Sequence, residues 1–300
     1  MRAIGIVAIA VVVEQAGLVT PGRGAGLLDV ARRRFLLSLL VRKELRVRYR
    51  ASVLGLAWSY VKPAVQYVVY FVAMGLFLEL NKGVPDFAVY LFSGMIAVNL
   101  FSEALGNATR SVINNADLVK KIYLPRELFP VASVWVAIIH FLPQLVVLLV
   151  GALIAGWRPE AVPLLAAVMG FVILVTLATG LGLFFGALNA LYRDLENLVD
   201  LFLMVAVWLS PVLYNWQRVR DALNDFGIGW ALTSYQLNPV TVAVELFHWA
   251  FWYPAADVGA DVLPPNLLWY GAGAVGFSLL ALAVGQAVFR KVEGRFAQEL

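Results

Sequence analysis

Six apolar stretches, each long enough to cross a bilayer as a helix, constrain this chain more than any other feature of its sequence. An α-helix rises about 1.5 Å per residue, so about 20 apolar residues are needed to span the hydrocarbon core. Charged residues make up only 14% of the chain, against about 25% in soluble domains. The sequence therefore predicts an all-α, polytopic membrane protein with six transmembrane helices. The predicted spans are 57–80, 86–108, 129–156, 161–188, 197–215 and 266–289.

The basic residues between these spans indicate how the chain is oriented. With the N-terminus in the cytoplasm, only Lys82, Arg158, Arg218 and Arg220 of the 23 Lys and Arg residues fall outside. Lys- and Arg-rich loops of membrane proteins stay in the cytoplasm. We therefore expect a multi-pass protein of the cytoplasmic (inner) membrane with cytoplasmic N- and C-termini.

The chain divides into three parts. We expect 1–26 to form a loosely attached N-terminal extension, 27–52 a basic amphipathic helix, and 53–300 the six-helix transmembrane domain, with an outer segment at about 216–265. The apolar run 3–13 resembles the core of a signal peptide, but it is too short to span and no clean small-residue cleavage site follows it. A cleaved or additional segment remains the alternative for this extension.

The amphipathic helix is basic on one side. On a helical wheel Arg42, Lys43, Arg46 and Arg50 gather opposite a mainly leucine face, and Arg48 falls outside this pattern. Such a helix lies flat on a membrane surface with its apolar face in the interface. It is either an anchor to anionic lipids alone, or an anchor that also offers a docking ledge to a soluble partner.

A second, short helix is predicted in the segment NNADLVKKIYLPR, residues 114–126. Its start suits an Asn cap followed by an acidic first turn, and Pro125 ends it after about two turns. Such a short helix is marginal alone, so it needs a surface to lean on, either the basic helix of this chain or another protein. The residues assigned to this helix and its edges are Asn114, Asn115, Asp117, Leu118, Lys120, Lys121, Tyr123, Leu124 and Arg126.

The sequence lacks the parts needed to use ATP by itself. No lysine follows a glycine, so the phosphate-cradling pattern GxxxxGK[ST] is absent. If the protein uses ATP, another chain supplies the ATP site and its Mg, and no cofactor is expected on this chain. The lack of cysteine excludes disulfides, thiolate nucleophiles and thiolate metal sites. The net charge of +4 is small, so nucleic acid is a poor candidate ligand.

Aromatic and ionisable residues mark the interior of the predicted spans. Aromatic faces pack on sugar rings, so an aromatic lining suits a polysaccharide path, although interface belts and core packing are the first explanation of aromatic residues in spans. The candidates for the lining are Tyr67, Tyr70, Phe71, Trp208 and Tyr214. Glu103 and His140 are candidates for a polar path or a proton relay, or else for a bonded structural role. Neither has an obvious partner four residues away, apart from Asn107 near Glu103.

Glycines recur in the fourth and sixth predicted spans, where they favour close helix packing. They are Gly170, Gly180, Gly182, Gly186, Gly271, Gly273, Gly276 and Gly285.

The outer segment predicts a helix that does not cross. Ser210–Pro211 ends the fifth span early, and Asn238–Pro239 offers a cap and a helix-initiating proline ahead of an apolar run that continues to Trp252. This run is too short to span, so it is a re-entrant or interfacial helix that can gate an outer mouth. The residues assigned to the outer gate are Asn238, Pro239 and Glu245.

Several segments together resemble the ABC-2 type transporter permeases, and among these the polysaccharide exporters of O-antigen, teichoic-acid and galactan systems. The resemblance covers about 30–300. It rests on RKELRVRYRASVLGLAWSYVKP from Arg42, NNADLVKKIYLPRELFPV from Asn114, NALYRDLENLVDLFL from Asn189, SPVLY from Ser210, LNPVT from Leu237 and the C-terminal FRKVEGRFAQEL. The N-terminal extension and Gln217–Gln236 depart from the compact family pattern.

The resemblance implies a homodimer of six-helix permeases that rests on two copies of a separate ATPase. The basic helix is similar to the family's interface helix, and Asn114–Leu124 is similar to its coupling helix, which enters a cleft of the ATPase subunit. Half-helices around Val219–Ala222 and Pro239–Trp252 correspond to gate helices, and the conduit lies on the dimer axis.

The leading hypothesis is a permease that moves a lipid-linked polysaccharide outward at the expense of ATP hydrolysed by its partner, without covalent chemistry of its own. One alternative is an ABC-2 permease for drugs or lipids. Another is a membrane glycosyltransferase or acyltransferase, which needs acidic and histidine residues gathered at one interface. The candidates for that gathering are scattered along the outer segment: Asp221, Asp225, His248, Asp257 and Asp261.

Overall fold

The computed structural model describes residues 26–300 apart from 51, 54, 122–123 and 259–261, and no strand occurs in these residues. The predicted N-terminal extension therefore lies outside the described residues except for Gly26. The first half contains α2 (Leu27–Arg32), α3 (Arg34–Arg48), η1 (Gly55–Ala57), α4 (Trp58–Tyr70), the π-helical η2 (Phe71–Phe77), η3 (Leu80–Gly83), α5 (Phe87–Asn114), α6 (Ala116–Lys121) and α7 (Leu128–Ile154). The second half contains α8 (Ala161–Asn189), α9 (Leu195–Leu209), α10 (Trp216–Asp225), α11 (Ala231–Gln236), α12 (Pro239–Phe247), the π-helical η4 (His248–Trp252), α13 (Tyr253–Ala256), α14 (Leu267–Val292), η6 (Glu293–Arg295) and α15 (Phe296–Glu299).

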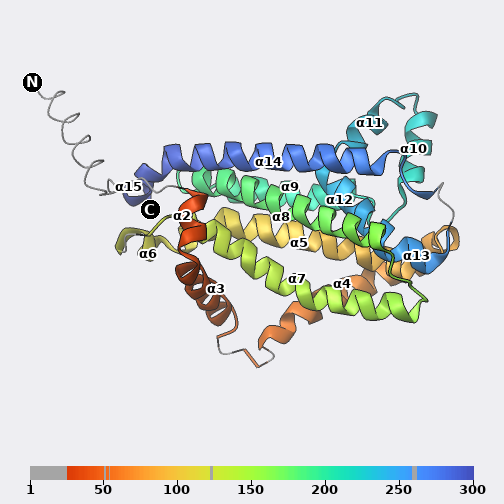
Figure 1. Cartoon of the computed structure of the whole chain (residues 1–300), viewed down its shortest axis with the longest axis horizontal. Helices are drawn as coiled ribbons and strands as arrows, with labels where there is room; N and C mark the ends of the chain where they lie inside the picture. Colours follow the sequence, from red (N-terminus) through yellow and green to blue (C-terminus); the bar gives the residue numbers. More distant parts are fainter. Residues whose placement is uncertain (1–25, 51, 54, 122–123, 259–261) are drawn as a thin grey trace, which may run out of the picture.

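The long helices lie side by side, and the short helices collect at the two ends of the bundle (Figure 1). We name the end with α2, α3, α6 and α15 the basic end, because the arginines of the first two helices gather there. The end with α10, α11 and α13 is the opposite end. Helix α3 runs obliquely across the basic end instead of parallel to the long helices (Figure 1).

Five helical segments among the described residues are long and apolar enough to cross a membrane. They are Trp58–Phe77, Phe87–Asn114, Leu128–Ile154, Ala161–Asn189 and Leu267–Arg295. Each coincides with a predicted span, because a run of about 20 apolar residues has few stable options other than a helix in lipid. The prediction of an all-α, polytopic membrane protein is confirmed.

The predicted span 197–215 is wrong at its C-terminal side. Helix α9 stops at Leu209, ahead of Ser210–Pro211, because proline has no N–H to continue the helix. At 15 residues, α9 is about 22 Å long, which is shorter than a hydrocarbon core of about 30 Å.

The predicted span 86–108 is too short, because α5 continues to Asn114. Arg110, which lies beyond the predicted span, stays inside the helix and pairs with two carboxylates of α9. Its Nε atom lies 3.6 Å from Glu196 Oε2, and its Nη2 atom bonds Asp200. Because these two carboxylates compensate its charge, Arg110 is accommodated within the helix.

Helix α5 is the centre of the bundle, and α4 lies at its edge. In the most apolar stretch of each segment, 72% of the residues of α5 are buried, against 6% in the segment formed by α4 and η2. The first crossing helix therefore exposes most of its apolar surface to lipid or to another protein.

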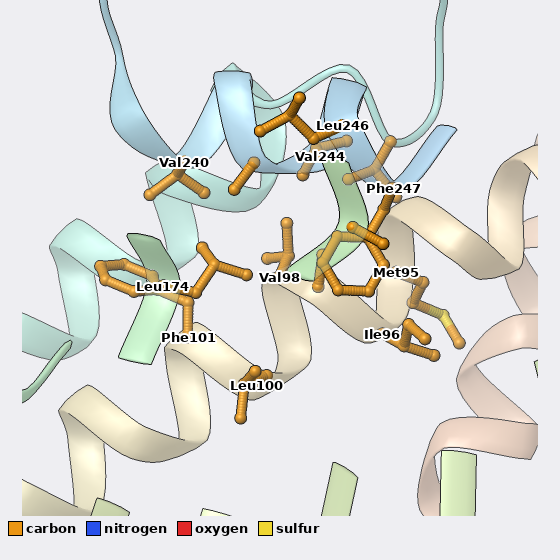
Figure 2. Packing of buried hydrophobic residues seen from close by; sticks show 14 of the residues in the cluster. Met95, Ile96, Val98, Leu100, Phe101, Leu174, Val240, Val244, Leu246 and Phe247 are labelled. Atoms are coloured by element: carbon orange, nitrogen blue, oxygen red, sulfur yellow. The ribbon is translucent and has the colours of Figure 1, made fainter. Parts of the chain in front are cut away.

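The core around α5 is apolar and includes residues from the short helix α12. Met95, Ile96, Val98, Leu100 and Phe101 of α5 gather with Leu174 of α8 and with Val240, Val244, Leu246 and Phe247 of α12 (Figure 2). Helix α12 follows α11 and leads through η4 to α13, and both neighbours lie at the opposite end (Figure 1). The predicted re-entrant helix is thus buried within the bundle instead of lying on its surface.

Glycines bring α8 and α14 together, as predicted for part of the set. A Cβ on Gly180 would lie 2.5 Å from the backbone nitrogen of Leu282, and a Cβ on Gly285 would meet the carbonyl oxygen of Gly180. The prediction of close packing is wrong for Gly273 and Gly276, where a Cβ would meet nothing within 4 Å. These two glycines face away from the neighbouring helices.

Candidate functional site

A second apolar cluster holds the basic end together. It combines residues of α2, α3, α5, α6, α7, α8, α14 and α15, which makes the N-terminal helices, the segment after α5 and the C-terminus one packed unit. Its buried members include Leu40, Val119, Phe129, Phe289 and Phe296. The short helices of this end are therefore packed directly against the ends of the long ones.

The basic amphipathic helix predicted for 27–52 consists of two helices, because the backbone breaks at Arg33 (φ −99°, ψ 38°). Leu40 of α3 is buried against the bundle, and the predicted basic face is exposed to solvent. On α3 that face consists of Arg42, Lys43 and Arg46; Arg50, predicted to belong to it, lies in the turn that follows the end of α3 at Arg48.

Helix α3 is also fixed to α7 by a polar contact. The hydroxyl of Ser133 donates to both carboxylate oxygens of Glu44 at 3.2 Å. Burial raises the pKa of Glu44 above its ordinary value, while the hydrogen bond from Ser133 and the charges of Arg48 and Lys43 oppose that rise. One side of α3 thus packs on the membrane helices, and the basic side stays open to a partner.

The short helix α6 leans on this chain. Val119 is buried in the cluster of the basic end, and Leu118 and Leu124 pack against it. The surface under α6 belongs to this chain, but its main contacts with α6 come from α5 and α15 instead of from the basic helix. Lys43 of α3 donates to the side chain of Asn115, the residue between α5 and α6, so α3 is bonded to the junction of these two helices.

Asn115 does not cap α6 with its side chain, contrary to the prediction. Its side-chain nitrogen donates to the carbonyl of Ser111 at 2.8 Å, while its oxygen accepts from Lys43. Its backbone carbonyl instead accepts from Leu118 and Val119 at 2.9 and 3.0 Å, which starts the helix. Asn114 is the last, exposed residue of α5.

The exposed face of α6 is smaller than predicted. Asp117, Lys120 and Lys121 point to solvent, and Asp117 lies 3.8 Å from Lys121. Arg126 instead bonds the carbonyl of Glu293 and stacks 5.7 Å from the ring centre of Phe296, so it holds the C-terminal segment. Tyr123 and its neighbour Ile122 lie outside the described residues.

Glu103 and His140 are partners of each other, which their separation in sequence concealed. His140 Nδ1 donates to Glu103 Oε1 at 2.6 Å, and Arg48 Nη1 lies 2.6 Å from the same oxygen. On the far side of the ring, His140 Nε2 accepts from the hydroxyl of Tyr49 at 2.8 Å, and that hydroxyl lies 2.6 Å from Ser59 Oγ. This chain of bonds, which we name the polar network, links the end of α3 to α4, α5 and α7 inside the membrane-spanning part.

The predicted lining residues fall into two separate groups in the protomer. Tyr67 stacks on Phe71 with ring centres 6.0 Å apart, meets Phe92 edge-on, and donates to the carbonyl of Ala88 at 3.2 Å. Tyr70 and Phe71 are partly buried against the main core.

The second group lies around the turn after α9. Trp208 is 53% exposed, and the hydroxyl of Tyr214 donates to its carbonyl at 2.5 Å. Tyr90 of α5 holds this turn with hydrogen bonds of 2.8 Å to the carbonyls of Pro211 and Tyr214. Tyr67 and Trp208 lie on α4 and α9, and both helices expose several large apolar side chains.

The predicted outer gate begins as the sequence indicated and then turns inward. Asn238 accepts from the backbone nitrogen of Val240 at 3.0 Å, and Pro239 occupies the first turn of α12. Glu245 is buried, and its Oε2 atom lies 3.6 Å from Nδ1 of His248, whose ring stacks on Tyr90 at 4.0 Å. Helix α12 is therefore an internal helix, and any displacement of it requires repacking of the core in Figure 2.

Comparison with known proteins follows the same segments. Residues 36–252 match the sequence profile of the family described as ABC-2 type transporter. The O-antigen export system permease protein RfbA of Klebsiella pneumoniae is 27% identical over 270 residues, which cover 88% of this chain and 95% of that protein. The protein of the same name from Myxococcus xanthus is 29% identical over 63% of this chain and 71% of its own length. The polysialic acid transport protein KpsM of Escherichia coli is 22% identical over 84% and 91%.

Proposed function

The chain belongs to the ABC-2 type transporter family, and we propose that it is the transmembrane subunit of an ATP-driven exporter that moves a lipid-linked polysaccharide across the cytoplasmic membrane. The observation that carries this proposal is the similarity to O-antigen export permeases along 88% of the chain. The relatives of both kinds, for O-antigen and for polysialic acid, handle long sugar chains, which favours a polysaccharide over a drug as cargo.

We propose that two copies of a separate ATPase dock on the basic end, which lies in the cytoplasm. Helices α6 and α3 suit this role, because each packs one face on the bundle and leaves charged side chains free on the other. ATP and Mg bind to the partner, and this chain contributes no catalytic group. Movement of the partner pushes α6, and the contact between Lys43 and Asn115 passes that movement to α3.

We further propose that the protein works as a homodimer whose conduit lies between the two copies. The segment of α4 and η2 is almost unburied, and α9 exposes Phe202, Met204 and Trp208. Two copies that meet along these helices cover both surfaces and bring the aromatic groups of Tyr67 and Trp208 to a shared axis. Such a lining lets sugar rings slide on aromatic faces.

The test is charge reversal on α6 in the complete complex. The chain is co-expressed with its partner ATPase subunit, and the variant Lys120→Glu/Lys121→Glu is compared with the wild type for surface glycan and ATPase activity. We expect transport-linked ATPase activity to fall about tenfold, because reversal of two interfacial charges costs roughly 1.4 kcal/mol.

The matched control is Arg290→Glu/Lys291→Glu, which makes the same charge change on exposed residues of α14 at the same end. Normal export and ATPase activity in the α6 variant would refute the proposed coupling. Equal losses in both variants would assign the effect to general attraction toward the membrane or the partner instead of to α6.

A further inference from the structure

A polar cavity of about 870 Å³ opens between α3, α4, α5 and α7, at the site of the polar network. Glu103 lies inside the membrane-spanning α5, roughly 16 Å along the axis from Asn114. Polar cavities at such a depth are expensive and usually functional. The size suits a ligand headgroup, since ligand pockets measure about 300–1,000 Å³. Its lining includes Lys62, Gln66, Asn99, Ser102, Asn107 and Gln144.

The charge of the cavity favours an anion. Arg48 and Lys62 contribute two fixed positive charges against the one carboxylate of Glu103, which Arg48 and His140 already engage. Within the described part of the chain, Lys62 makes no ion pair or hydrogen bond, and its side chain is exposed at the cavity. A phosphate placed there receives a charge-assisted hydrogen bond that no protein group supplies.

Two buried polar atoms at the cavity lack partners. Ser102 Oγ and Gln144 Oε1 are shielded from solvent and make no hydrogen bond with the described residues. The Gln144 side chain is nearly fully buried, at 6% exposure, and only its nitrogen is bonded, to the carbonyl of His140. Buried polar groups usually have partners, and a rotation of either side chain toward the cavity would offer these oxygens to a ligand with hydroxyl groups, as a sugar has. The indole of Trp58 at the rim offers a face for a sugar ring.

An apolar groove of about 510 Å³ continues from this cavity between α4, α5 and α7. The two spaces share Pro63 and Gln144. The groove then follows Val147, Gly151 and Ile154 to the end of α7, which lies at the opposite end. A hydrocarbon chain can occupy this apolar groove, whereas a soluble anion without a lipid chain would leave it unfilled.

We propose that the polar cavity and the apolar groove, which together we name the wedge, bind a phosphate-bearing glycolipid, with the phosphate at Lys62 and Arg48, the first sugars among the amides and Ser102, and the lipid chain in the groove. The assignment rests on the proposed function, because the glycolipid is the anchored end of the exported polysaccharide. It also places the cargo beside Arg48, at the end of the helix that we expect the ATPase to move.

The test is equilibrium binding to the purified complex of this chain and its ATPase, without nucleotide, in phosphatidylcholine nanodiscs. The probe is tritiated farnesyl phosphoryl-glucose, which joins a lipid chain, a phosphate and one sugar. We expect Lys62→Gln to weaken binding about tenfold through the lost charge-assisted bond, and Lys62→Arg to restore it. We expect Gly151→Leu to weaken binding about tenfold by filling the groove, since a Cβ at Gly151 meets nothing within 4 Å and the fold tolerates it.

The matched control is Gly273→Leu, which adds the same side chain to an open glycine of α14 away from the wedge and should bind like the wild type. Glucose phosphate without a chain and farnesyl phosphate without a sugar should each bind more weakly than the complete probe. Wild-type binding in Lys62→Gln or in Gly151→Leu overturns the proposal. Displacement of the probe by equimolar phosphatidylglycerol also overturns it, because the wedge would then hold ordinary anionic lipid.

Export in cells separates this proposal from the proposed function. Loss of binding in Gly151→Leu with wild-type surface glycan would show that the bound lipid is not cargo, and it would leave the exporter assignment intact. Normal probe binding with export that does not depend on the ATPase would refute the exporter assignment and keep the lipid site.

Discussion

Separating Arg48 from Glu103 tests whether the basic end and the membrane interior are joined by the polar network. The guanidinium Nη1 atom lies 2.6 Å from the carboxylate oxygen, and the two side chains are 38% and 28% exposed. A hydrogen bond between charged groups contributes about 1.5–3 kcal/mol, and an exposed ion pair contributes about 0.2–1 kcal/mol. Since this pair is partly exposed, we expect a coupling free energy of about 1–2 kcal/mol.

A double-mutant cycle measures this coupling directly. Arg48→Met, Glu103→Gln and the double variant are unfolded thermally in mixed detergent micelles, and free energies are compared with the wild type. We expect Glu103→Gln to cost more than Arg48→Met, because Glu103 also accepts from His140 at 2.6 Å. The double variant should be more stable than the sum of the two losses predicts, by the coupling free energy.

The control cycle pairs Glu103→Gln with Arg34→Met, an exposed arginine in the first turn of α3. Independent sites add within about 0.3–0.5 kcal/mol, so this cycle should show no coupling. If the losses in the Arg48 cycle also add within this range, the ion pair is refuted, and with it the link from α3 to the membrane interior.

Three further outcomes follow from the packing. Gly285→Leu should prevent close packing of α8 and α14 and reduce the yield of folded protein, whereas Gly273→Leu should give the wild-type yield on size-exclusion chromatography. Lys43→Met should lower coupled ATPase activity by roughly threefold to tenfold without loss of assembly, because it cuts the tie to Asn115; an unchanged rate excludes that tie from coupling. Burial raises the pKa of Glu44 above the ordinary value of 4.5, so the folded state binds this proton more tightly than the unfolded chain does. Ionisation of Glu44 therefore lowers the free energy of unfolding as the pH rises above 4.5. Glu44→Gln should therefore melt higher than the wild type at neutral pH, and the difference should vanish in acid; the reverse trend would contradict the burial.

The crossing helices could be predicted because lipid leaves an apolar run few structures other than a helix. Local end signals also worked where they involve neighbours in sequence. Asn238–Pro239 starts α12 with the predicted cap, and Pro211 marks the end of α9, although the predicted span ran past it. The face that a glycine presents could not be predicted, because packed and lipid-facing surfaces are both apolar. The sequence therefore does not distinguish Gly273 and Gly276 from Gly285, although a Cβ on either of the first two would contact no neighbouring helix.

The candidate site was predictable only in its parts. The sequence identified Glu103 and His140 as unusual, yet helical spacing shows only partners three or four residues away. Glu103 and His140 are bonded to each other although they lie 37 residues apart, and Arg48, the other partner of Glu103, precedes it by 55 residues. Arg48 itself seemed an exception to the amphipathic pattern of its helix, and it is the residue that turns toward the membrane interior.

Helix α3 is bonded both to the residue that precedes α6 and to the polar network. Its Lys43 bonds Asn115 at the end of α5, and its Arg48 bonds Glu103 within α5. The two bonds are roughly 8 Å apart along α3 and roughly 18 Å apart along α5. Because the two spacings differ, α3 crosses α5 obliquely and is fixed to it at two separate points. A displacement of α6 that moves Asn115 must therefore tilt α3 or break one of the two bonds. A tilt of α3 changes the position of Arg48 at the polar cavity, so α3 would couple the proposed docking face of the basic end to the proposed glycolipid site.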